Sequence, residues 1–159
     1  MSDLPFIDEY NTVVAATPEV TFDALAVLVG RSFAGAPGRV FTALLGCAHR
    51  GASYSLPPQV GQELNGFRVA EAEWPHRLIL EGRHRFASYR LGFVIEPAAR
   101  GGSRLSARTD AAFPGLAGGL YRLCVIGSGA HALIAKRMLS GVAHKAARMS
   151  AGSTIRPTT

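Results

Sequence analysis

Cysteine is scarce in this sequence. Cys47 and Cys124 are the two cysteines among the 159 residues, and they form no C-x-x-C motif. Neither a disulfide framework nor a thiolate metal site is therefore indicated. The acidic N-terminus, with Asp3, Asp8 and Glu9, also lacks the basic and apolar regions of a signal peptide. Both observations predict a cytoplasmic protein.

Long hydrophobic runs are also absent. The most apolar stretch runs from Leu116 to Ala135, but Arg122 and the small or polar residues at 127–131 interrupt it. A membrane-spanning helix needs about 20 predominantly apolar residues. We therefore expect no stable insertion into a membrane, while peripheral contact with a membrane stays open.

Acidic residues are missing from the C-terminal part of the chain. No Asp or Glu follows Asp110, although the whole chain has a formal net charge of +6. The cations beyond this position are Arg122, Lys136, Arg137, Lys145, Arg148 and Arg156. Such a basic half can attract anionic lipid, nucleic acid or an acidic ligand. Cations near a helix C-terminus also complement the helix dipole and keep the surface solvated, and we favour this simpler interpretation.

Motifs that would hold a metal or a nucleotide are lacking as well. The five histidines are His49, His76, His84, His131 and His144. Their spacing includes no H-x-H, H-x-x-H or H-E-x-x-H pattern, so no metal site is expected. Residues 127–132, GSGAHA, match G-x-G-x-x-A, but no acid follows about 20 residues later, as a dinucleotide site requires. We interpret this segment as a close-packing entry into a helix, and no cofactor is expected.

The residues that are present describe a globular chain. Hydrophobic residues make up 48% of the sequence and charged residues 18%, which is typical of a folded protein. The length fits one domain. We predict a single domain over residues 1–149 and a flexible tail over the small, polar residues 150–159.

Three consecutive segments, 77–86, 87–96 and 103–113, alternate apolar and polar residues with a period of two. This pattern is typical of strands with one buried face, and residues 67–73 are predicted to add a further strand. The apolar faces contain Leu78, Leu80, Gly82, His84, Phe86, Tyr89, Leu91, Phe93, Ile95, Leu105, Ala107, Thr109, Ala111 and Phe113. The outward faces carry arginines without interleaved aromatic residues, so no nucleic acid is expected as a partner.

Along the sequence, helices are predicted both before and after the strands of this antiparallel sheet. A β-leaning segment at 9–16 precedes a helix that begins at the N-cap Thr17 and runs to about Val29. A shorter helix is expected at 38–48 and a long one at 130–148. The apolar arc of the long helix contains Ile134, Ala135, Met138, Leu139, Val142, Ala146 and Met149. Because this arc can cover the apolar face of the sheet, the predicted fold class is α+β.

A cavity between the sheet and the long helix is the candidate site. The residues expected to bind a ligand there are Leu80, His84, Tyr89, Leu91, Phe93, Leu105, Thr109, His131, Ile134, Met138 and Val142. A buried imidazole needs hydrogen-bond partners or a lowered pKa. His131 is therefore the candidate catalytic acid or base, with Tyr89 or His84 to orient a substrate. The alternative is a structural histidine satisfied by a nearby carbonyl.

Two segments and the order of the elements resemble a known superfamily. They are residues 15–22, AATPEVTF, and the stretch from Gly119 through His131 to Leu139. The chain resembles the helix-grip (SRPBCC, START-like) superfamily of lipid-transfer domains, plant pathogenesis-related proteins and bacterial polyketide cyclase or dehydratase-like proteins. The resemblance implies a curved antiparallel sheet wrapped around a long C-terminal helix, with a hydrophobic cavity. It implies no catalytic residues, since the superfamily has no common set.

Three functions are compatible with these features. The first is binding of a hydrophobic or amphipathic small molecule, for transport or sequestration, by a monomer or homodimer. The second is a cyclase- or dehydratase-like enzyme that uses His131. The third is an interaction protein that docks on an anionic membrane through its basic C-terminal half.

Overall fold

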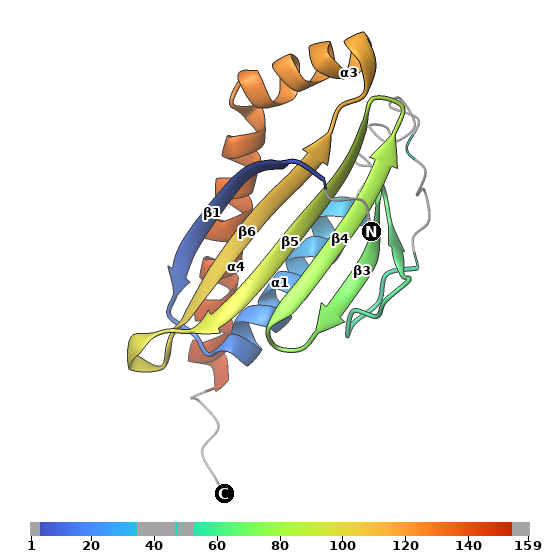
Figure 1. Cartoon of the computed structure of the whole chain (residues 1–159). Helices are drawn as coiled ribbons and strands as arrows, with labels where there is room; N and C mark the ends of the chain where they lie inside the picture. Colours follow the sequence, from blue (N-terminus) through green and yellow to red (C-terminus); the bar gives the residue numbers. More distant parts are fainter. Residues whose placement is uncertain (1–3, 35–46, 48–52, 154–159) are drawn as a thin grey trace, which may run out of the picture.

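The computed structural model of the chain describes residues 4–34, 47 and 53–153. Its sheet has six strands in the order β1-β6-β5-β4-β3-β2, and every neighbouring pair is antiparallel (Figure 1). The strands are β1 (Phe6–Val14), β2 (Glu63–Leu64), β3 (Phe67–Glu73), β4 (Arg77–His84), β5 (Ala87–Pro97) and β6 (Ser103–Ala112). The helices are α1 (Pro18–Ala34), α3 (Gly115–Arg122) and α4 (Ala130–Ser153), with the 3₁₀ turn η1 (Ala99–Gly101) and the π-helical turn η2 (Leu123–Gly127).

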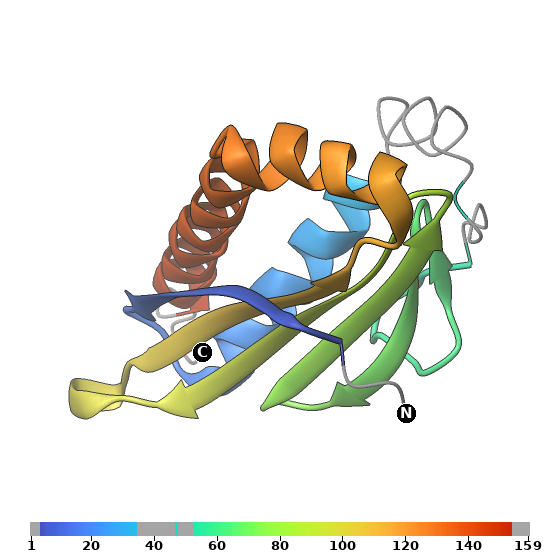
Figure 2. The ribbon, with the colours of Figure 1, turned by 45° about the horizontal axis from the view of Figure 1, so that its top comes forward.

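The helices lie on one side of the sheet. Figures 1 and 2 show α1 and α4 against the same face, while α3 crosses the end of the sheet between β6 and α4. A curved antiparallel sheet with a long C-terminal helix packed against it confirms the predicted α+β, helix-grip architecture.

The core fills the space between the sheet and the two long helices. The large side chains that are at most 2% exposed are Val14, Phe22, Leu25, Val29, Leu64, Val69, Leu78, Leu80, Phe93, Ile95, Leu105 and Val142. Burial of one such side chain stabilises the fold by roughly 1.5–3 kcal/mol. Between the helices, a Cβ added at Gly141 would lie 3.3 Å from Leu28 Cδ1, so α4 approaches α1 closely at this glycine.

The predicted strands agree closely with the observed ones. Residues 67–73 form β3 as predicted, and the strands predicted at 77–86, 87–96 and 103–113 begin at the expected residue and end within two residues of the expected position. The β-leaning segment at 9–16 corresponds to β1, which begins three residues earlier, at Phe6, and ends at Val14. The break between 77–86 and 87–96 contains no Gly, Pro or Asn, yet Arg85 and Phe86 form a tight turn there. The backbone N–H of Phe86 donates to His84 Nδ1 at 3.1 Å and so helps to close it.

The helices depart from their predicted bounds. α1 continues beyond Val29 to Ala34, and α4 continues to Ser153, so residues 150–153 of the predicted tail are helical. The helix expected at 38–48 falls outside the described residues except at Cys47, which is buried. The short helix α3 and strand β2 were not predicted.

The prediction of which residues form the buried face of α4 was partly wrong. Leu139, Val142 and Ala146 are buried as predicted, but the Ile134 side chain is 64% exposed. At 3.6 residues per turn, Ile134 points roughly 110° away from the centre of the three buried residues. Ile134 therefore lies outside the face that packs on α1, β1 and β6.

Two glycines on opposite faces of the sheet provide a stability test. A Cβ at Gly82 would overlap the carbonyl oxygen of Gly66 and the ring of Tyr89, whereas a Cβ at Gly92 would meet no atom within 4 Å. We expect Gly82→Ala to lower the free energy of unfolding by about 1–3 kcal/mol through overpacking. Gly92→Ala, the matched control, should change it by less than about 0.5 kcal/mol or stabilise the strand. Urea denaturation measures both, and equal effects would contradict the packing argument.

Candidate functional site

A pocket of about 450 Å³ lies on the flank of α1. Its lining residues are Ala26, Val27, Gly30, Arg31, Tyr54, Ser55, Leu56, Glu63, Leu64 and Asn65. They come from the C-terminal half of α1, from the segment that precedes β2, and from β2 with the residue after it. The pocket therefore lies beside α1, and not between the sheet and α4.

Tyr54 forms a wall of this pocket and is held by α1. Its hydroxyl donates a hydrogen bond to the carbonyl oxygen of Ala26 at 2.8 Å. Its ring lies against Gly30, where an added Cβ would be 2.8 Å from Cε1. Burial raises the pKa of Tyr54 to about 12, so the phenol stays neutral at physiological pH. Tyr54 thus acts as an apolar wall and a hydrogen-bond donor rather than as a base.

Asn65 fixes the opposite wall. Its side chain is buried, and Nδ2 donates to the carbonyl oxygen of Phe33 at 2.8 Å. This bond ties the end of α1 to the turn between β2 and β3, where Gly66 has φ 85°. The rings of Phe33 and Phe67 pack there with centroids 4.6 Å apart. The pocket walls are therefore joined by specific bonds between segments that are distant in sequence.

The chemistry of the pocket is mainly apolar with charge at two positions. Ala26, Val27, Leu56 and Leu64 supply apolar surface, while the exposed Arg31 supplies a guanidinium. Glu63 adds a carboxylate from β2. An apolar wall beside a cation suits a molecule with an apolar body and an anionic group.

Among the described residues, the lining of this pocket includes none of the predicted ligand-binding residues. Leu80, Phe93, Leu105 and Val142 are at most 1% exposed within the packed core. Leu91 and Met138 are partly buried against that core. Ile134 is on the surface, which corrects its placement on the inner arc. A role in ligand binding for the other residues stays a prediction.

The predicted polar residues bind mainly to the protein itself. The hydroxyl of Tyr89 donates to the carbonyl oxygen of Gly66 at 2.7 Å. His84 Nδ1 accepts the backbone N–H of Phe86. Both side chains therefore hold turns at the same end of the sheet.

His131 lies in a polar cluster between the start of α4 and the sheet. Its Nε2 is 3.0 Å from Thr109 Oγ1 and 3.4 Å from Asp8 Oδ1. Thr109 and Asp8 lie opposite each other on β6 and β1. Burial, together with the charge of Asp8 and a hydrogen bond to it, raises the pKa of the neighbouring Tyr10. His131 and Thr109 are therefore in contact, and their role in ligand binding stays a prediction.

Asp8 was missed as a member of this cluster. The predicted strand began at Glu9, and a carboxylate is not expected on the apolar face of a sheet. Alternation back from the buried Val14 through Thr12 and Tyr10 nevertheless puts Asp8 on the inner face. Both Asp8 and Thr109 contact the same ring nitrogen, so the geometry differs from a triad in which the acid and the hydroxyl use opposite nitrogens.

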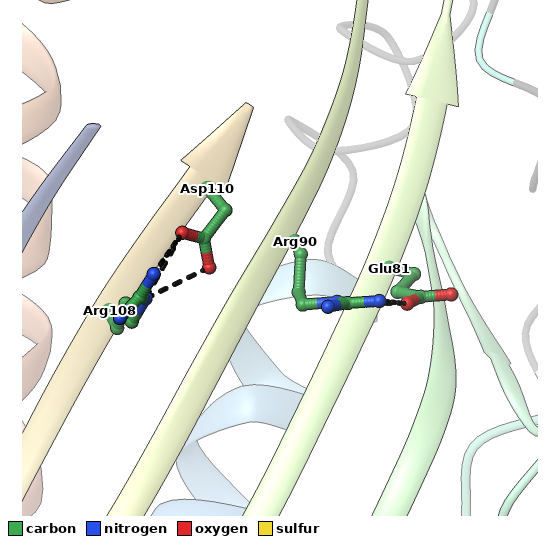
Figure 3. Close-up of polar contacts among 4 residues, drawn as sticks. All are labelled: Glu81, Arg90, Arg108 and Asp110. Carbon is green, nitrogen blue, oxygen red and sulfur yellow. Dashed lines mark hydrogen bonds and ion pairs between the residues drawn. The ribbon is translucent and has the colours of Figure 1, made fainter. Parts of the chain in front are cut away.

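The outer face of the sheet carries charges of both signs. Arg108 Nη2 lies 2.9 Å from Asp110 Oδ1, and Arg90 Nε donates to Glu81 Oε1 at 2.9 Å (Figure 3). Arg77 pairs with Glu71 at 3.1 Å. A shallow cavity of about 250 Å³ lies above Gly92 between these pairs. The exposed Arg77–Glu71 pair is worth roughly 0.2–1 kcal/mol, as on a solvated sheet face, whereas Asp110 is buried.

His84 generates a pH prediction. Burial lowers its pKa below the ordinary value of 6.5. The unfolded chain therefore takes up this proton first, so the contribution of His84 to stability is present above pH 6.5 and is lost as the pH falls below it. His84→Asn keeps an acceptor for the Phe86 N–H but cannot titrate. Urea unfolding at pH 7.5 and 5.5 should show a smaller loss of stability for this variant, and an equal loss in both proteins would refute the prediction.

Comparison with known proteins identifies the fold. No protein-family model matches the sequence, and no curated protein matches it. A structure from Nitrosospira multiformis has a TM-score of 0.55 at 13% identity, over 89% of this chain and 95% of that one. One from Rhizobium loti has a TM-score of 0.52 at 16% identity, over 91% and 99%. One from Rhodobacter sphaeroides has 0.50 at 19% identity, over 86% and 95%. At these identities the likeness establishes a shared fold.

Proposed function

We propose that the chain binds a small apolar or amphipathic molecule in the pocket beside α1. The observation that carries this proposal is the pocket itself, with about 450 Å³ of space and a lining rich in apolar side chains. Pockets for small molecules usually enclose roughly 300–1,000 Å³ and combine such a lining with a few polar groups. Arg31 is the group that would meet an anionic end of the ligand.

The helix-grip architecture supports the same class of function by analogy. The resemblance to that superfamily implies binding of lipids, polyketides or other apolar metabolites, and the fold places this chain in a compatible architecture. The proposed place of binding nevertheless changes from the space beneath α4 to the flank of α1. We propose that the chain acts in the cytoplasm, since neither Cys47 nor Cys124 forms a disulfide.

The binding proposal is tested with an apolar fluorescent dye that carries an anionic group, anilinonaphthalene sulfonate. Leu56 lines the pocket and is 54% exposed, so Leu56→Ser should weaken dye binding by about 1 kcal/mol, or roughly fivefold. Val60 is 66% exposed in the same segment but outside the lining, so Val60→Ser is the matched control. A fluorescence titration measures both affinities. Equal affinities for the two variants would sink this location.

A cyclase- or dehydratase-like enzyme is the second candidate. The cluster of Asp8 and Thr109 around His131 favours it, because a carboxylate beside an imidazole can hold that imidazole for acid or base catalysis. His131→Gln keeps an amide that can donate to both oxygens but cannot transfer a proton at neutral pH.

Native mass spectrometry of protein purified from its host distinguishes the two functions. A dehydratase should carry product in the wild type and substrate in His131→Gln, so that the two bound masses differ by one water. A binding protein should carry the same mass in both, and this result would exclude His131 as the catalytic group of a dehydratase.

A further inference from the structure

The helix α3 exposes its large apolar side chains to solvent. Leu116 is 96% exposed, Leu120 64% and Leu123, the first residue of η2, 67%. Their spacing of four and three residues places them on one helical face. A surface helix in a globular protein normally turns such a face toward the core. The helix α3 instead turns its apolar face toward the solvent.

Gly118 explains why the leucines point outward. It is buried on the opposite face of α3, where an added Cβ would lie 2.7 Å from the carbonyl carbon of Phe113 and 3.0 Å from the carbonyl oxygen of Phe86. The helix therefore rests on the protein through a glycine that permits close backbone contact. A leucine could not take this place without displacing backbone atoms.

The apolar exposure continues into the start of α4. After the turn at Gly129, whose φ is 74°, Leu133 is 52% exposed and Ile134 64%. Figure 1 shows α3 leading across the end of the sheet to the first turn of α4. We call these five side chains, Leu116, Leu120, Leu123, Leu133 and Ile134, the leucine surface. Several large apolar side chains exposed on consecutive elements point to an interaction site.

The surrounding charge selects the kind of partner. The sequence contains no acid after Asp110, while Arg122 belongs to α3. Arg137 follows Leu133 by four residues and Ile134 by three, so it flanks them on the helix surface. A second copy of the chain would bring these cations face to face, which costs free energy. An anionic bilayer would instead complement them.

We propose that the leucine surface docks on an anionic lipid bilayer. Leu116, Leu120 and Leu123 enter the boundary between headgroups and acyl chains, and Arg122 and Arg137 contact lipid phosphates. Among the helices that the structure describes, none is long and apolar enough to cross a membrane. The segment therefore lies in the membrane interface. This docking is independent of the pocket beside α1, with which the leucine surface shares no residue.

Sedimentation of the full chain with vesicles tests the proposal. We expect binding to vesicles of phosphatidylcholine with phosphatidylglycerol, weaker binding to phosphatidylcholine alone, and a loss of binding with added salt. The double variant Leu120→Ser, Leu123→Ser should bind at least tenfold more weakly. Its matched control is Val13→Ser, Val60→Ser, which removes two side chains that are 65% and 66% exposed elsewhere. Urea unfolding should show that both double variants are folded.

A second pair of double variants tests how much the arginines contribute to vesicle binding. Arg122→Gln, Arg137→Gln should weaken binding several-fold and flatten its salt dependence, whereas Arg68→Gln, Arg104→Gln on the exposed strand positions should not. Equal binding by the leucine variant and its control would overturn the proposal. So would a wild-type dimer that Leu120→Ser, Leu123→Ser converts to a monomer without any vesicle binding, because the leucine surface would then cover a second copy.

Discussion

The packing of α1 is the constraint on which the rest of this structure depends. Phe22, Leu25 and Val29 seal the inner face of the sheet, and Leu28 packs against Gly141 of α4. The remaining face of α1, with Ala26, Val27, Gly30 and Arg31, forms the pocket with Tyr54. One helix therefore closes the core, positions the C-terminal helix and provides the floor of the proposed binding site. A change of its register would alter all three at once.

Close approaches at glycine define where functional side chains lie. Gly30 lets the ring of Tyr54 reach α1, Gly82 lets Tyr89 reach the carbonyl of Gly66, and Gly118 lets α3 rest on backbone. None of these three glycines has a positive φ, so each is explained by the space it leaves and not by its backbone conformation. Among these contacts, those of Gly30 with Tyr54, Tyr89 with Gly66 and Gly118 with Phe86 join segments that are far apart in the sequence.

These contacts also explain how much the sequence could predict. The bounds of strands β3 to β6 were predicted to within two residues, because a strand with one buried face alternates apolar and polar residues. The turn at Arg85 and Phe86 contains no Gly, Pro or Asn, so the sequence did not indicate it clearly. The pocket depends on the contact between Tyr54 and Gly30, which no local sequence pattern predicts. The helix α3 was not predicted, because its leucines face the solvent while Gly118 packs against the protein. Amphipathic helices usually bury their apolar face instead.

A row of aromatic rings links the two proposed sites. Ring centroids are 4.6 Å apart from Phe33 to Phe67, 5.1 Å from Phe67 to Tyr89, 5.5 Å from Tyr89 to His84 and 6.1 Å from His84 to Phe86. The carbonyl of Phe33 holds Asn65 in the pocket wall, and the carbonyl of Phe86 supports α3 at Gly118. The pocket and the leucine surface therefore share one end of the sheet.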